Sequence, residues 1–185
     1  MLQSLTAKVS RSGSPSGGFT AGSFYGFKGE VRLIIYAIIA IAMIAIDQLV
    51  KAWVVAHVAI GGYAALIPGV ISITHIKNTG AAWSMFEGQQ WFFYIVTVIA
   101  LAVVVWLWRD SSHKPLYRTG LTLITAGALG NFIDRVHQHF VTDMFQLDFV
   151  NFPIFNVADM CLTVGVILVV VYVVLIDGRE QRGRG

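Results

Sequence analysis

Residues 127–159 read GALGNFIDRVHQHFVTDMFQLDFVNFPIFNVAD and carry the polar residues around which the rest of the chain is organised. The stretch places Asp134, Asp143 and Asp159 at the edges of segments that are apolar enough to sit in a bilayer. Burying ionisable groups in such surroundings is costly, so intramembrane carboxylates usually serve a function. This stretch is therefore the first place to look for a site.

The composition around this stretch is that of a membrane protein. The chain has 185 residues, of which 56% are hydrophobic and 12% charged, whereas soluble domains carry about a quarter charged residues. Four apolar segments, 31–55, 91–108, 119–136 and 156–176, each come close to the ~20 residues that a membrane-spanning helix needs. We predict an all-α polytopic membrane protein with four transmembrane helices. The third segment is the most polar, so we expect it to be buried among the others through its small residues.

The distribution of basic residues predicts the orientation in the membrane. Of the 13 lysines and arginines, all but Lys51, Lys77 and Arg135 lie in the N-terminal tail, between the second and third segments, or at the C-terminus. The positive-inside rule makes these regions cytoplasmic. The predicted organisation is a flexible Ser/Gly-rich tail at 1–29, a four-helix membrane domain at 30–178 with extracytoplasmic regions at about 56–90 and 137–155, and a basic cytoplasmic tail at 179–185.

The first extracytoplasmic region contains a short strand signal. Residues 71–74 alternate apolar and polar side chains, which is typical of a strand and predicts a small sheet outside the bilayer. Gly61-Gly62 and Pro68-Gly69 are expected to form turns on either side of the neighbouring segment.

Two local pairings are expected near the ends of the helices. Asp47 and Lys51 are spaced i, i+4 and can pair on one helix face. They form either a structural ion pair or a support in which Lys51 fixes the loops of a site or meets an anionic head group. Asn156 and Asp159 have the spacing of a capping box at the start of the last helix.

Two further groups of polar residues allow more than one interpretation. Asn131, Asp134 and Arg135 are neighbours in the third segment and predict a hydrogen-bonded ion-pair cluster that supports a site. The motif Asn78-Thr79-Gly80-Ala81-Ala82-Trp83 is either a tight turn with an interfacial tryptophan or a place where Asn78 offers its amide to a substrate. In the second case, Gly80 and the alanines let another chain approach closely.

The chemistry becomes specific if Asp143 and Asp159 meet. Two neighbouring carboxylates hold one shared proton, so one member can take a proton from water while the other polarises a carbonyl. Taken alone, Asp143 is equally well interpreted as a solvated loop carboxylate. We expect it on a mobile loop, with Asp159 fixed at a helix start.

Metal chemistry is not expected. His137 and His139 are two residues apart, a spacing that fits no helical zinc motif, and no cysteine accompanies them. We therefore predict neither a metal nor another cofactor.

The ordered motifs together resemble a known family. The segments Asp47-Gln48-Leu49-Val50-Lys51, Asn78 to Trp83, Gly130 to Arg135, Val141-Thr142-Asp143 and Phe155 to Asp159 resemble those of lipoprotein signal peptidase, also called signal peptidase II. The resemblance implies an aspartic endopeptidase of the bacterial inner membrane. Such enzymes cleave diacylglyceryl-modified prolipoproteins on the N-terminal side of the lipidated cysteine.

The resemblance also implies roles for individual residues. Asp143 and Asp159 match the catalytic aspartates. The remaining matches are to site-lining and supporting positions: Asn78, Gly80, Asn131, Arg135, Asn156, Asp134, Asp47 and Lys51. The resemblance implies a prolipoprotein substrate, membrane lipids and globomycin-type inhibitors as binding partners, and no nucleic acid. It also implies that the site lies near the outer face of the membrane.

Two other functions fit the polar residues. A small ion or proton pathway would also place carboxylates within a membrane, although such sites usually lie near the bilayer midplane between repeats. A non-catalytic membrane scaffold would use the polar cluster only to hold its helices together.

Overall fold

The structure is a computed structural model, and it describes residues 21–81 and 85–177. The chain divides into two compact units, Met1–Leu33 and Ile34–Gly185. The arrangement given below is that of the second unit. The predicted tail at 179–185, and Trp83 of the Asn78 motif, lie outside the described residues.

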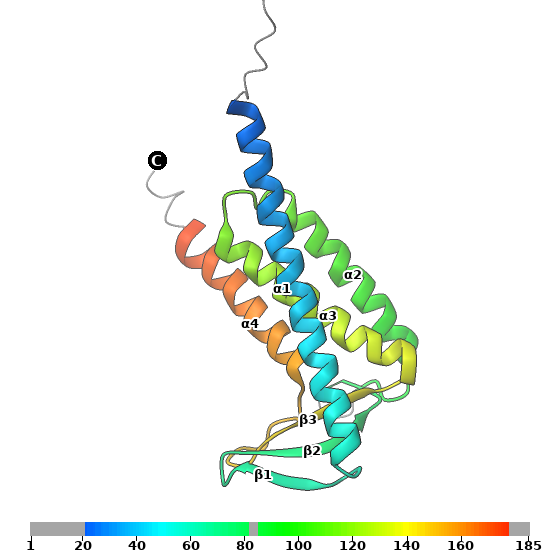
Figure 1. Cartoon of the computed structure of the whole chain (residues 1–185). Coiled ribbons are helices and arrows are strands. Elements are labelled where there is room, and N and C mark those ends of the chain that lie inside the picture. The colour runs from blue at the N-terminus through cyan, green and yellow to red at the C-terminus, as the bar shows by residue number, and fades with distance from the viewer. Residues whose placement is uncertain (1–20, 82–84, 178–185) are drawn as a thin grey trace, which may run out of the picture. The chain divides into compact units, whose positions relative to one another are not determined.

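The described residues contain four long helices, each of which covers one of the predicted apolar segments (Figure 1). Their bounds are α1 Ala21–His57, α2 Gln90–Trp108, α3 Pro115–Gln138 and α4 Val157–Val171, and α4 continues as a π-helical turn, Tyr172–Asp177. α1 begins at Ala21, ten residues before the predicted apolar segment 31–55. The glycines in this first part of α1 each cost about 1 kcal/mol of helix stability. Each residue added to the helix also contributes one backbone hydrogen bond, which favours extension.

Three stretches of the described residues are long and apolar enough to cross a membrane: Arg32–His57, Gln90–Trp108 and Val157–Ile176. α3 does not meet this standard, so four crossing helices are not established. α3 instead contains ten buried residues, among them Leu121, Ala126 and Gly130. The expectation that the third segment is covered by the others is confirmed.

Small residues bring α3 and α4 into close contact. A Cβ atom on Gly165 would lie 2.7 Å from the carbonyl oxygen of Gly120, and one on Gly120 would lie 2.8 Å from the carbonyl oxygen of Gly165. Farther along, a Cβ on Gly127 would collide with the carbonyl oxygen of Ala158. The two backbones can approach this closely only because these positions lack side chains.

Gly165→Ala is expected to destabilise the fold by about 1–3 kcal/mol, the usual cost of adding a methyl group to a tightly packed contact. Where no contact is crowded, alanine in a helix is more stable than glycine by up to about 1 kcal/mol. The sign of the change in unfolding free energy therefore shows whether the contact is tight. Thermal unfolding in detergent measures it. Ala102→Val adds volume at an exposed position of α2 and should change the midpoint little. A higher midpoint for Gly165→Ala would show that the α3–α4 contact is loose.

A three-stranded antiparallel sheet lies at one end of the helices (Figure 1). Its strands are β1 Tyr63–Ile67, β2 Ile71–Asn78 and β3 Val141–Leu147, in the order β1-β2-β3. The predicted strand at 71–74 is confirmed as part of β2. The predicted turns are also found, with positive φ angles at Gly61 and Gly69.

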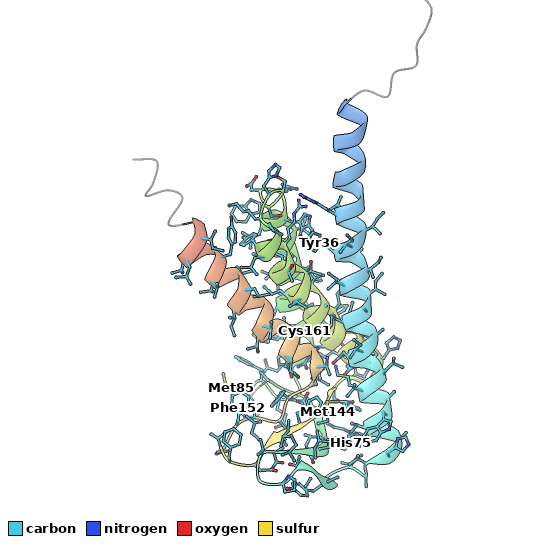
Figure 2. The ribbon with its side chains drawn as sticks, turned by 60° about the vertical axis from the view of Figure 1, so that its left-hand side comes forward. Tyr36, His75, Met85, Met144, Phe152 and Cys161 are labelled. Atoms are coloured by element: carbon cyan, nitrogen blue, oxygen red, sulfur yellow. The ribbon has the colours of Figure 1, made fainter. Side chains whose placement is uncertain are left out.

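The two ends of the helices are built differently. Met144 and His75 lie at the sheet end, whereas Tyr36 lies toward the opposite end (Figure 2). There, the ring of Tyr36 packs edge-on against Trp108, and the guanidinium of Arg118 lies over the Trp108 ring, 5.1 Å from its centroid. The functional residues predicted from the sequence all fall nearer the sheet, where helix ends and strands meet.

Candidate active site

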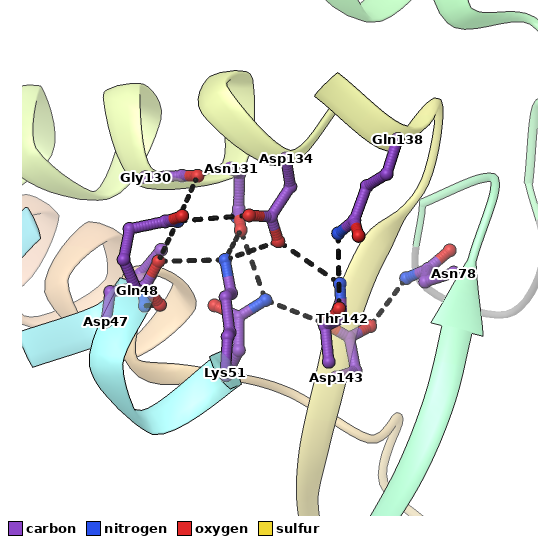
Figure 3. Close-up of polar contacts among 12 residues, drawn as sticks. Asp47, Gln48, Lys51, Asn78, Gly130, Asn131, Asp134, Gln138, Thr142 and Asp143 are labelled. Atoms are coloured by element: carbon purple, nitrogen blue, oxygen red, sulfur yellow. Dashed lines mark hydrogen bonds and ion pairs between the residues drawn. The ribbon is translucent and has the colours of Figure 1, made fainter. Parts of the chain in front are cut away.

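Five separate parts of the chain contribute polar side chains to one region at the sheet end of the helices (Figure 3). Three come from helices α1, α3 and α4, and two from strands β2 and β3. The central residues are Lys51, Asn78, Asn131, Asp143 and Asp159.

The start of α4 has the predicted capping box. The Asn156 side chain accepts a hydrogen bond from the Asp159 backbone N–H at 2.9 Å, and Asp159 Oδ2 accepts one from the Asn156 backbone N–H at 3.1 Å. The expectation from their spacing is confirmed. The carboxyl group of Asp159 therefore has a fixed position at the helix start.

Asp143 lies on strand β3 and is only 2% exposed. The expectation of a mobile loop was wrong, and so was the solvated alternative. β3 pairs along its length with β2, and the register places Asp143 opposite Ile76 and Val141 opposite Asn78. Asn78 and Asp143 therefore lie diagonally on the same face of the sheet.

Amide groups hold both carboxylates, and Asn156 links the two. Asn156 Nδ2 donates to Asp143 Oδ1 at 2.6 Å, while Asn78 Nδ2 donates to Asp143 Oδ2 at 2.7 Å. Asn131 Nδ2 donates to Asp159 Oδ1 at 2.8 Å. A carboxylate offers about four acceptor positions, so each of these aspartates keeps acceptor capacity beyond its amide contacts.

A buried ion-pair group lies behind this pair. Lys51 Nζ contacts Asp47 at 2.8 Å and Asp134 at 2.9 Å, and it donates to Asn131 Oδ1 at 3.1 Å. The predicted Asp47–Lys51 pair is confirmed. Because the ammonium occupies Asn131 Oδ1, the Asn131 amide nitrogen is left to face Asp159.

The predicted cluster of Asn131, Asp134 and Arg135 does not form as expected. Asp134 pairs with Lys51 of α1, whereas Arg135 Nη2 donates to the Gly80 carbonyl oxygen at 2.8 Å. The guanidinium also lies over the ring of Phe93, 3.8 Å from its centroid. Consecutive positions on a helix point in different directions, so adjacent residues in the sequence meet different elements.

A cavity of about 550 Å³ opens beside the two carboxylates. Asn78, Asn131, Arg135, Asp143 and Asp159 provide its polar lining. The rest is largely apolar: Ala81, Val141, Leu147, Phe152, Pro153, Ile154, Phe155, Met160 and Val164. Pockets of this size with a few converging polar groups commonly bind ligands.

The electrostatic environment favours a proton on Asp143. Burial raises the pKa of Asp143 to about 7, and the nearby charge of Asp159 acts in the same direction. Hydrogen bonds from Asn78 and Asn156 act in the opposite direction but are smaller effects. Near neutral pH, the pair can therefore both hold and release a proton, as general acid–base chemistry requires.

Comparison with known proteins identifies the family. Residues 39–175 match the family model described as signal peptidase (SPase) II. This chain belongs to the signal peptidase II family. It is 54% identical over 144 residues to the lipoprotein signal peptidase of Latilactobacillus sakei, covering 77% of this chain and 95% of that protein. It is 50% identical over 147 residues to that of Lactiplantibacillus plantarum, covering 80% and 99% of the two chains.

Two solved structures of bacterial membrane enzymes have a similar fold. A bacterial membrane enzyme determined by the in meso method at 2.3 Å resolution superposes with a TM-score of 0.75 at 36% identity, covering 80% of this chain and 91% of that one. A second, at 1.9 Å, gives a TM-score of 0.72, also at 36% identity, and covers 77% and 94%. As a member of the signal peptidase II family, the chain is a bacterial membrane protease.

Two glutamines of this site were not predicted from the sequence. Gln48 Nε2 donates to Asp134 Oδ1 at 3.0 Å and to the Gly130 carbonyl oxygen at 3.2 Å. A polar residue within an apolar helix next to Asp47 was a usable signal. Gln90, which contacts Arg135, lies at the start of α2, and its sequence context gave no such signal.

Proposed function

We propose that this chain cleaves the signal peptide from diacylglyceryl-modified prolipoproteins, with Asp143 and Asp159 as its catalytic pair. The observation that carries the proposal is the link through Asn156 between two carboxyl groups that line one largely apolar cavity. The family assignment supports the reaction, and this arrangement supports the roles of the two residues.

In the proposed mechanism the aspartates share one proton. The ionised carboxylate accepts a proton from water, whose oxygen attacks the scissile carbonyl carbon, while the protonated carboxyl donates a hydrogen bond to the carbonyl oxygen. As the peptide bond breaks, the aspartate pair donates a proton to the leaving nitrogen. The supporting residues are Asn78, Gly80, Asn131, Arg135, Asn156, Asp134, Asp47 and Lys51, which hold the carboxyl groups or the elements that carry them. The reaction assigns no role to a metal or cofactor.

The membrane arrangement is part of the proposal. α3 would be the fourth crossing helix, shielded from lipid by its neighbours, and the concentration of basic residues would place both termini in the cytoplasm. The sheet and the catalytic pair would then lie near the outer face of the bacterial inner membrane. There, the apolar side of the cavity can accommodate the acyl chains of the substrate.

A cleavage assay on a lipidated precursor tests the function. Purified protein in detergent or lipid should convert a diacylglyceryl-modified prolipoprotein to a faster-migrating product on a gel, and globomycin should block the conversion. Conversion of the unlipidated precursor at an equal rate would contradict the proposed substrate class. Ion flux without cleavage would point to transport, and the absence of both activities to a scaffold.

Cleavage is expected to slow as the pH rises above about 7. A carboxyl group with a raised pKa is protonated below that pKa and ionised above it, so the pair loses its shared proton as the pH rises past the Asp143 value of about 7. The rate should then fall toward tenfold per pH unit. Initial rates between pH 6 and 9 measure the effect, with thermal midpoints recorded at each pH. An unchanged rate up to pH 9 would contradict the requirement for this proton.

A further inference from the structure

The side chain of Gln90 joins two parts of the site that are distant in the sequence. Gln90 is the first residue of α2, and its Nε2 donates to the Thr79 carbonyl oxygen at 3.0 Å. Its Oε1 accepts a hydrogen bond from Arg135 Nη1 at 3.3 Å. One half-buried side chain thus contacts both the backbone after β2 and the guanidinium from α3.

The backbone at Thr79 and Gly80 is held from two sides. Gln90 binds the Thr79 carbonyl, and Arg135 Nη2 binds the next carbonyl, that of Gly80, at 2.8 Å. Arg135 is itself 8% exposed and packs on the ring of Phe93. The Gly88 backbone N–H also donates to the Thr79 carbonyl oxygen, at 3.2 Å. Removing the Gln90 contacts would therefore take away the side-chain hydrogen bond to this carbonyl and free one nitrogen of the guanidinium.

This backbone orients the amide of Asn78. The Gly80 backbone N–H donates to Asn78 Oδ1 at 2.9 Å. Because the amide oxygen is occupied in this way, the amide nitrogen faces the other direction and donates to Asp143 Oδ2 at 2.7 Å. The orientation of this donor therefore depends on where the Thr79–Gly80 backbone lies.

The Thr79–Gly80 backbone has little freedom to rearrange. Gly80 is buried, and a Cβ atom at this position would lie 2.6 Å from the carbonyl oxygen of Met85. The backbone N–H of Ala81 also donates to that oxygen, at 2.7 Å. A displacement of the Thr79 carbonyl would therefore be passed on to the Asn78 amide.

We propose that Gln90 is a positioning residue for the peptidase reaction: it holds the Thr79–Gly80 backbone and Arg135, and thereby sets the Asn78 amide against Asp143. The inference rests on the proposed function, because it assigns Gln90 an effect on Asp143 as a catalytic group. Gln90 does not need to touch the substrate for this role.

Gln90→Met tests the inference, because methionine has a similar length and cannot make either hydrogen bond. We expect kcat for the lipidated precursor to fall roughly ten- to thirtyfold, as expected for two hydrogen bonds of ordinary strength, with KM changed less than threefold. Gln89→Met is the matched control, since Gln89 is exposed and its side chain makes no capping hydrogen bond. It should retain the parent kcat.

The pH profile distinguishes positioning from a general loss of structure. The Asn78 hydrogen bond lowers the pKa of Asp143, so loosening it in Gln90→Met should move the alkaline limb to higher pH. Asn78→Ala should move the limb in the same direction. In the double variant Asn78→Ala/Gln90→Met, the loss of kcat should be much smaller than the product of the two single losses, because both changes act on one interaction.

Several outcomes would overturn the inference. One is that Gln90→Met has the same kcat as Gln89→Met, or a higher KM with unchanged kcat. Others are that the losses of kcat multiply in the double variant, or that the alkaline limb of the Gln90→Met pH profile does not move. Asp143→Asn is measured in the same assay to separate this inference from the proposed function. If Asp143→Asn still turns over at close to the parent rate, Asp143 is not part of the catalytic pair and the proposed function fails in that part. If only Asp143→Asn is inactive and Gln90→Met behaves like its control, the positioning role alone fails.

Discussion

Asp143→Asn is expected to reduce the rate of cleavage of a diacylglyceryl-modified precursor by about 10²- to 10⁴-fold, which is the range that a positioned general acid or base contributes. Asparagine has nearly the same shape as aspartate but cannot share a proton with Asp159 in the way a carboxyl group does. Asp159→Asn should have an effect of the same order. Its side-chain oxygen can still accept the hydrogen bond from the Asn156 backbone N–H, so the start of α4 should remain intact.

The measurement is single-turnover cleavage followed on a gel, with thermal stability measured on the same preparations. Asp148→Asn is the matched control, because Asp148 lies beyond the end of β3 and its carboxylate contacts Ser72 and Tyr63 of the sheet instead of the cavity. It should cleave at close to the parent rate. Near-parental turnover by Asp143→Asn or Asp159→Asn would remove that residue from the catalytic pair.

Lys51→Met is expected to destabilise the fold by about 3–5 kcal/mol, the usual cost of leaving buried charges without their partner. Lys51 is 4% exposed, and its ammonium lies between the carboxylates of Asp47 and Asp134. Asp47 also accepts the Ala158 backbone N–H at 2.8 Å, so this group joins α1 to the start of α4. Methionine keeps most of the side-chain volume, so the loss of stability reports mainly the missing charge.

The single cysteine of the chain offers a direct readout of this loss. Cys161 is buried on α4 (Figure 2), so a thiol-reactive fluorophore should label it only as the fold opens. Heating in the presence of the probe gives an apparent unfolding midpoint, which should fall markedly in Lys51→Met. Lys77→Met is the control: Lys77 is exposed and lies over the Phe140 ring, a contact worth about 0.5–1 kcal/mol.

A compensating variant tests the stated cause. Lys51→Met combined with Asp47→Asn and Asp134→Asn removes the unpaired negative charges while keeping the side-chain shapes. Neutral replacement of a whole buried ion-pair group is often tolerated, so this variant should recover part of the lost midpoint. A Lys51→Met midpoint within error of the Lys77→Met midpoint would show that the buried charges are not held by Lys51.

Features that depend on neighbouring residues were predictable from the sequence. The Asp47–Lys51 pair and the Asn156–Asp159 capping box each lie within one helical turn, so their spacing alone specifies the contact. The apolar segments were recognisable for a similar reason, since the length and composition of a helix are local properties. The resemblance to signal peptidase II also rested on short motifs in a fixed order.

Features that depend on contacts between distant segments were not predictable in the same way. The partner of Asp134 is Lys51 of α1, although Arg135 is adjacent to it in the sequence. Asp143 is buried on a strand because β3 pairs with β2, a register that neither strand specifies alone.

The sequence by itself determined the apolar helices, the local pairs at their ends, and the family. Only the tertiary structure decided which polar groups of 127–159 meet. There, Asp143 and Asp159 are joined through Asn156, while Asp134 and Arg135 turn to different elements. The physical reason is that buried polar groups must find partners wherever packing brings them, and packing joins residues that are far apart along the chain.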